Sequence, residues 1–169
     1  MIWLVIISML IIAAYTAAVC IKVKGVPYSI SETFYKLEHP KWFMATMWLT
    51  AGFLMPVILE VSKANTEWAA FLACVGMFFV GAAPNFKDEF EGKIHTAGAI
   101  LCIIGSQAWV AFNCPWCLFV WLAYVIYTAV MIFKKVSDSF VSDFLRTRPM
   151  FWIEIAALAA TYLTVLIRM

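Results

Sequence analysis

The sequence predicts an all-α integral membrane protein, a single domain over residues 1–169 that contains six transmembrane helices. Of the 169 residues, 65% are hydrophobic and 13% are charged, whereas a soluble domain has about 45–50% apolar and about 25% charged residues. The mean hydropathy is +0.92, and the apolar residues fall in six long runs. This composition excludes a soluble domain and a disordered chain, and a net charge of only +2 excludes a nucleic-acid binder.

The six apolar runs have the length that a transmembrane helix needs, which is about 20 residues. They cover residues 2–23, 41–61, 67–84, 94–113, 115–133 and 149–167. Each run is apolar on every face, whereas the strands of a membrane barrel alternate polar and apolar residues. No basic residue precedes the first run, which is also longer than the apolar part of a signal peptide, so we expect it to remain as a helix.

Prolines mark most ends of these runs. Pro56 is the exception, because it lies inside the second run, one turn after Gly52, and we expect it to kink that helix. The connections between runs are short, which favours an up-down bundle. Gly98 and Gly105 share a face of the fourth helix and allow close contact with a neighbour. The other prolines lie in loops or at the ends of runs: Pro27, Pro40, Pro84, Pro115 and Pro149.

The basic residues predict the orientation in the membrane. Ten of the twelve lysines and arginines lie in the loops after the first, third and fifth runs, and only Lys63 and Arg168 lie on the opposite side. Cytoplasmic loops of membrane proteins carry such an excess of positive charge. We therefore expect loops one, three and five in the cytoplasm and both termini outside, in a bacterial inner membrane or a plasma membrane.

Loop three contains the first group of candidate site residues. If the fourth helix extends back through this loop, Asp88, Glu91 and His95 lie on one face, although Gly92 weakens that continuity. A carboxylate beside an imidazole can act as a general base or bind a metal. The alternative is an interfacial histidine held by a neighbouring acid within a solvated charged loop.

Loop one contains a second polar group, on the same predicted side of the membrane. Ser29, Ser31 and Glu32 lie close together in sequence, and Ser31 or Thr33 can instead cap a short helix. Because both loops must meet at one membrane face, we expect residues 29–32 to lie near residues 85–95. Such a pocket would combine a catalytic group of His95, Asp88 and Ser31 with ligand-binding residues, namely Ser29, Glu32, Asn85, Glu91 and Glu154.

Glu154 is the only acid well inside a predicted span. It lies about five residues into the sixth helix, roughly 7–8 Å deep at 1.5 Å per residue. An acid at that depth is costly and marks either a functional site or a side chain that reaches back to the interface. The chain has two histidines and no HxxxH or HExxH pair, so the sequence predicts no metal site, and it predicts no cofactor.

Cys114 and Cys117 form a Cys-Pro-Trp-Cys motif at the start of the fifth helix. A helix N-terminus favours a thiolate, so a redox role is chemically reasonable. A membrane disulfide oxidase, however, relays electrons between two cysteine pairs, and the other cysteines (Cys20, Cys74 and Cys102) form no second pair on that side. We therefore expect that Cys114 and Cys117 are not a catalytic redox pair, even if they form a disulfide.

Three segments together resemble the DRAM/Frag-type membrane protein family, which includes damage-regulated autophagy modulators and a factor in GPI-anchor lipid remodelling. Residues 27–33 (Pro-Tyr-Ser-Ile-Ser-Glu-Thr) are similar to the family's Pro-Tyr-Ile-Ser-Asp-Thr, with one residue extra. Asn-Phe-Lys at residues 85–87 and His-Thr-Ala-Gly-Ala at residues 95–99 are similar to its Asn-Phe-Gln and His-x-x-Gly-Ala. Cys114-Pro115 is similar to a Cys-Pro pair after its fourth span.

This resemblance implies a six-helix bundle in which loops one and three form a shared polar site. The matching positions in this sequence are Ser31, Glu32, Asn85 and His95. The family is associated with lipid handling and membrane regulation, so the resemblance implies a membrane lipid as the partner.

Three functions follow from these observations. The first is a lipid-interacting or regulatory protein with a polar pocket at one membrane face, and the second is a lipid-modifying hydrolase or transferase that uses His95 with Ser31, Asp88 or Glu91. The third is a thiol oxidoreductase that uses the Cys-Pro-Trp-Cys motif. The sequence leaves open whether the chain forms a homo-oligomer or binds another membrane protein.

The predicted orientation can be tested with single cysteines in a cysteine-free background. We expect Asn65→Cys to react with a membrane-impermeant maleimide in intact cells, because it lies on the side with few basic residues. Ser137→Cys should react only after the membrane is permeabilised. Labelling of Ser137→Cys in intact cells would reverse the orientation.

Overall fold

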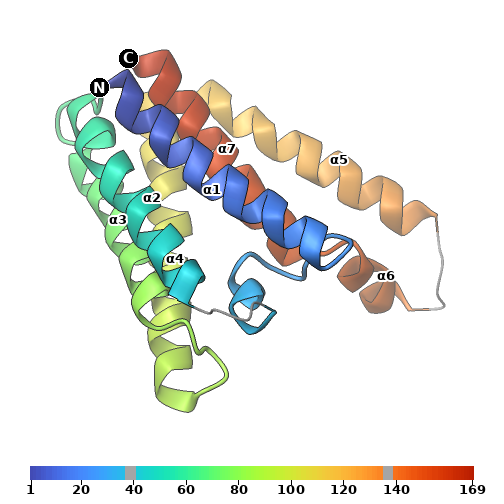
Figure 1. Ribbon diagram of the computed structural model, residues 1–169. Helices are drawn as coiled ribbons and strands as arrows, with labels where there is room; N and C mark the ends of the chain where they lie inside the picture. The colour runs from blue at the N-terminus through green and yellow to red at the C-terminus, as the bar shows by residue number, and fades with distance from the viewer. Residues whose placement is uncertain (37–40, 135–138) are drawn as a thin grey trace.

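The computed structural model is helical, as the sequence predicts, and describes residues 1–36, 41–134 and 139–169. Pro40 and Ser137 lie outside these described ranges. Within them, the elements are long helices joined by short helical turns (Figure 1). In chain order they are α1 (Ile2–Lys22), η1 (Ser31–Tyr35), α2 (Lys41–Glu60), α3 (Glu67–Ala82), α4 (Glu89–Asn113), η2 (Pro115–Phe119), α5 (Val120–Phe133), α6 (Phe140–Arg146) and α7 (Pro149–Arg168).

Five of the six predicted spans form helices that are long and apolar enough to cross a membrane. They are α1, α2, α4, α7 and the continuous segment Pro115–Phe133 made by η2 and α5. The predicted third span forms α3, which is apolar but has only 16 residues. Helix α3 ends early because Pro84 disfavours helical backbone in the residue before it, and the chain has left the helix at Ala83.

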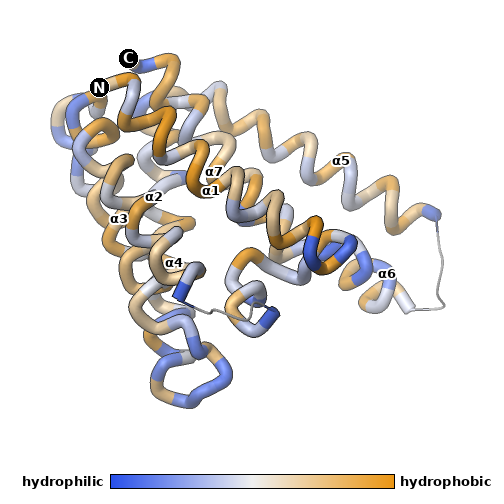
Figure 2. The backbone as a smooth tube through the Cα atoms, viewed as in Figure 1, coloured by the Kyte–Doolittle hydropathy of each residue, from blue (hydrophilic) through white to orange (hydrophobic). Residues whose placement is uncertain are grey.

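The helices pack as a bundle whose apolar residues follow the helices and whose hydrophilic residues gather in the connecting segments (Figure 2). Helices α2, α3 and α4 pack in order, α1 packs on α2, and α7 packs on α4, with α5 against α7. Both termini lie at the same end of the bundle (Figure 1). At that end, Arg168 Nε donates to Val61 O over 3.3 Å, and the Lys63 N–H donates to Asn113 Oδ1 over 2.7 Å.

Glycines bring α3 and α4 into backbone contact, as expected for Gly98 and Gly105. A Cβ atom added to Gly76 of α3 would lie 2.5 Å from Gly98 O of α4. One added to Gly105 would lie 2.8 Å from the Ala73 nitrogen of α3. Such close approach increases van der Waals contact, which is a main source of helix association in lipid. The α3–α4 pair is therefore the closest-packed part of the bundle.

Helix α4 begins five residues before its predicted start, so it does extend back through loop three. Asp88 caps it, because one carboxylate oxygen accepts hydrogen bonds from the N–H groups of Phe90 and Glu91, each over 3.0 Å. Such a cap satisfies N–H groups that have no partner within the helix. Gly92 lies within the helix, and a Cβ there would be 2.6 Å from Phe86 O. The glycine thus lets loop three fold back against α4.

The glycine contact predicts a clear difference between two alanine substitutions. Gly76→Ala should lower the free energy of unfolding by about 1–3 kcal/mol, because α3 and α4 must move apart. Gly52→Ala is the matched control, since nothing lies within 4 Å of a Cβ there, and it should be neutral or stabilising by up to about 1 kcal/mol. Unfolding in mixed micelles with increasing denaturing detergent measures both variants. Equal stability of the two would show that the glycine contact is unimportant.

Candidate functional site

Loop one, residues 23–36, folds through hydrogen bonds among its own residues. The Glu32 N–H, at the start of the short helix η1, donates to Ser29 Oγ over 2.9 Å. In return, Glu32 Oε2 accepts the Tyr28 N–H over 3.0 Å. The Glu32 carboxylate also lies 3.5 Å from Lys36 Nζ. Ser29 and Glu32, both predicted as ligand-binding residues, therefore shape the loop.

Two neighbouring helices hold loop one in place. Tyr15 of α1 shares a hydrogen bond of 2.6 Å with the buried Thr33 hydroxyl of η1. The Phe151 N–H in the first turn of α7 donates to Tyr28 O over 3.0 Å. The first N–H groups of a helix have no partner within it, so loop one supplies one of the missing acceptors.

Glu154 of α7 is the central side chain of the site. Its Oε2 accepts the Ile30 N–H over 2.5 Å, and the Ser31 backbone N–H and hydroxyl are also hydrogen-bond partners of the carboxyl group. Glu154 thus reaches toward loop one, as expected for an acid in a span that needs a polar partner. The sequence placed Ser31 and Glu154 in one site, and the structure brings them together.

A cavity of about 100 Å³ lies between loop one and the helices. Its lining is apolar except for Glu154, Ser31 and a few hydroxyl and thiol groups. Ile30 and Ser31 of loop one form part of the cavity wall. The lining residues are Ile12, Ile30, Ser31, Met47, Ala51, Leu54 and Ile58, then Ala73, Cys74, Met77, Val80, Ala99, Cys102, Ile103 and Ser106, and finally Glu154, Ala157, Leu158 and Thr161.

Tyr35 connects loop one to loop three. Its hydroxyl donates to Asn85 Oδ1 over 3.0 Å and accepts the Lys87 N–H over 2.9 Å. The Tyr35 ring packs edge-on against Phe86, with centroids 5.0 Å apart, and Lys87 Nζ lies 4.3 Å from the centre of the same ring. The two loops therefore contact each other through Tyr35, a residue outside the predicted site residues.

The three residues predicted as a catalytic group have different partners. His95 is buried, its Nδ1 lies 2.9 Å from Ala83 O, and its ring packs against Phe86. Asp88 caps α4, whereas Ser31 faces Glu154. The structure gives His95 a backbone carbonyl as its partner instead of a carboxylate.

Glu91 and Asn85 also take part in the folding of loop three. The Asn85 N–H donates to Glu91 Oε2 over 3.1 Å, while the Asn85 side chain accepts from Tyr35. Both ligand-binding candidates therefore hold the two loops in their observed positions. Among the described residues, no group of three or more His, Cys, Asp or Glu side chains could hold a metal ion.

A buried hydroxyl cluster was missed because its members are far apart in sequence. Ser8 of α1 donates to Thr50 O of α2 over 2.8 Å, and its oxygen lies 2.5 Å from Tyr162 Oη of α7. Polar groups within spans commonly pair with one another. The presence of Ser8 and Tyr162 in apolar spans was therefore the one feature of the sequence that could have predicted this cluster. The cluster joins three of the helices that enclose the cavity.

No protein-family model, curated protein or solved structure matches this chain.

The contacts of Glu154 predict how its substitution affects loop one. Glu154→Leu should lower the free energy of unfolding by about 1–3 kcal/mol, because the Ile30 N–H loses its acceptor. It should also speed hydrogen exchange over residues 28–33. Glu154→Gln keeps an oxygen acceptor and should have a smaller effect.

Glu60→Leu is the control, since Glu60 lies exposed at the end of α2. Hydrogen exchange with mass spectrometry on protein in nanodiscs measures all three variants. Unchanged exchange over residues 28–33 in Glu154→Leu would contradict the role assigned to Glu154.

Proposed function

We propose that this protein binds a membrane lipid by inserting the end of one acyl chain into the cavity beneath loop one. The observation that supports this proposal is an apolar cavity with Glu154 and Ser31 on its wall. Ligand sites usually combine an apolar lining with a few well-placed polar groups. The chain also lies in the medium that supplies such ligands, because it has five helices of membrane length.

The size of the cavity limits what it can accept. An engineered apolar cavity of about 150 Å³ binds benzene, so a cavity of about 100 Å³ suits the end of an acyl chain and not a whole lipid. The remaining part of the lipid would lie toward the polar surface made by loops one and three. There Lys87, whose ammonium group lies over the Tyr35 ring, would supply positive charge for a phosphate-containing headgroup.

Loop one is the element that would regulate access to the cavity. It is held by a few specific hydrogen bonds, from Tyr15, Phe151 and Glu154, and it contributes both Ile30 and Ser31 to the cavity wall. Displacing it would open the cavity without separating the helices. The protein would then act as a lipid-dependent regulatory protein.

The proposal also includes a sixth transmembrane span and the side of the membrane on which the termini lie. Helix α3, with 16 residues, would cross the membrane as the sixth span. It lies along the longer helix α4 in close backbone contact, and the bilayer can become thinner beside a short span. Both termini would be outside, from the distribution of basic residues. The resemblance of loops one and three to the DRAM/Frag-type family supports a role in lipid handling.

A lipid-modifying enzyme that uses His95 has less support. His95 Nδ1 has Ala83 O as its partner, and Asp88 is occupied as the cap of α4. The predicted pairing of His95 with a carboxylate would need the two side chains within hydrogen-bond reach of each other. The Asp88 carboxylate instead accepts from the Phe90 and Glu91 N–H groups. The contacts of His95 therefore favour lipid binding over catalysis.

The cavity can be filled from α4 to test the proposal. Ala99→Leu should weaken chain insertion by about fivefold or more, because overpacking costs about 1–3 kcal/mol. Ala97→Leu adds the same atoms on the exposed side of α4 and should have no effect. The measurement is photo-crosslinking in vesicles of phosphatidylglycerol that carries a diazirine at the end of one acyl chain.

Crosslinked peptides should come from the residues that line the cavity, and their yield should fall only in Ala99→Leu. Equal crosslinking of wild type and Ala99→Leu at these residues, or crosslinking confined to the outer surface, would refute the proposal.

A further inference from the structure

The Cys-Pro-Trp-Cys segment places two thiols side by side at the junction between α4 and η2. Helix α4 ends at Asn113, and Cys114 is its C-terminal cap. The Cys117 N–H then donates to Cys114 O over 2.9 Å, which closes a tight turn. This turn brings the two sulfur atoms within 3.4 Å, with the Cys117 thiol donating to Cys114 Sγ.

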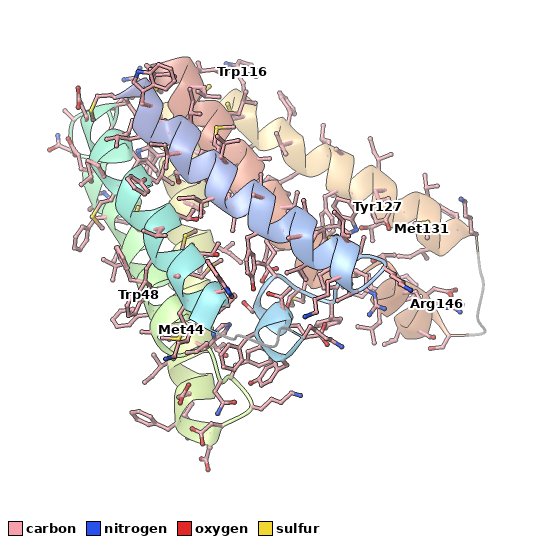
Figure 3. All side chains as sticks on the ribbon, viewed as in Figure 1. Met44, Trp48, Trp116, Tyr127, Met131 and Arg146 are labelled. Carbon is pink, nitrogen blue, oxygen red and sulfur yellow. The ribbon has the colours of Figure 1, made fainter. Side chains whose placement is uncertain are left out.

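The two thiols differ in accessibility. Cys117 is 3% exposed, and its thiol lies beside the Thr164 hydroxyl of α7, which itself donates to Ala160 O over 2.8 Å. Cys114 is half-buried. Trp116, between them, is 74% exposed and lies at the end of the bundle that carries both termini (Figure 3). A reagent from the aqueous phase at that end therefore meets Cys114 before Cys117.

We propose that Cys114 and Cys117 form a reversible thiol–disulfide exchange site for a soluble disulfide at this end of the bundle. Cys114 is the attacking thiol and Cys117 is the resolving thiol. The site is separate from the proposed lipid cavity, because neither cysteine is among the residues that line it.

The exchange has two balanced steps. The Cys114 thiolate attacks one sulfur of the external disulfide, that disulfide bond breaks, and the released sulfur takes up a proton. The Cys117 thiolate then attacks Cys114 Sγ in the mixed disulfide, which forms the Cys114–Cys117 bond and releases the second external thiol. The two cysteines lose two electrons and two protons, and the external disulfide gains both.

The geometry requires little movement for the second step. The sulfur atoms are 3.4 Å apart, so they must approach by about 1.4 Å to reach a bond of about 2.05 Å. The other cysteines are positioned elsewhere: Cys74 and Cys102 line the cavity, and Cys20 lies in the last turns of α1. The pair would therefore exchange electrons with an external disulfide and not relay them to a second internal pair, so the proposal departs from the expectation that Cys114 and Cys117 are not a catalytic redox pair.

The test uses full-length protein in nanodiscs, with oxidised glutathione as the probe and peptide mass spectrometry after acid quenching. Wild type should form the Cys114–Cys117 disulfide without a stable adduct. Cys117→Ser should accumulate glutathione on Cys114, because no resolving thiol remains. Cys114→Ser should form the adduct on Cys117 at least about tenfold more slowly, because buried cysteines are much less reactive.

Cys20→Ser is the control and should behave like wild type. Addition of reduced glutathione should restore both thiols in the wild-type protein. Two outcomes would overturn the proposal: wild-type protein that keeps both thiols free in excess oxidised glutathione, or Cys117→Ser that gains no adduct on Cys114.

Discussion

The hydrogen bonds between Glu154 and loop one are the interaction on which the candidate site depends. A carboxyl group in the first turns of an apolar helix needs partners, because unpaired polar groups are costly away from water. Loop one meets that need with the Ile30 N–H and with Ser31. The same contact satisfies the backbone of a loop that lies against apolar helices. Glu154 thus stabilises the position of loop one, and loop one stabilises the buried position of Glu154. Together they form one wall of the cavity.

Two kinds of packing support this arrangement. Helices α3 and α4 form a stiff unit through backbone contacts at Gly76, Gly98 and Gly105. Helices α1, α2 and α7 are instead joined by the hydroxyl cluster around Ser8. The cavity lies between these two groups of helices. Neither the glycine contacts of α3 and α4 nor the hydroxyl cluster of α1, α2 and α7 fills the space between the groups. Its apolar lining and its position in the bundle are the basis for the proposed binding of an acyl chain.

The two ends of the bundle have different chemistry. The end with loops one and three carries carboxylates and lysines, whereas the end with the termini carries the Cys114–Cys117 pair. Thr164 of α7 contacts Cys117, and Glu154 of the same helix contacts loop one. Helix α7 therefore contributes to both candidate sites, ten residues apart.

The sequence by itself determined the helical membrane architecture, because long apolar runs and proline positions act locally through hydropathy and backbone geometry. It also indicated Glu154 and Ser31, since a lone acid in a span requires a partner. Only the tertiary structure decided which partner each polar residue has. Tyr35 connects the two loops and His95 binds a carbonyl of α3's end, because such contacts depend on how distant segments meet. The cavity arose in the same way, from how the helices pack, whereas the early end of α3 follows from Pro84 in the local sequence.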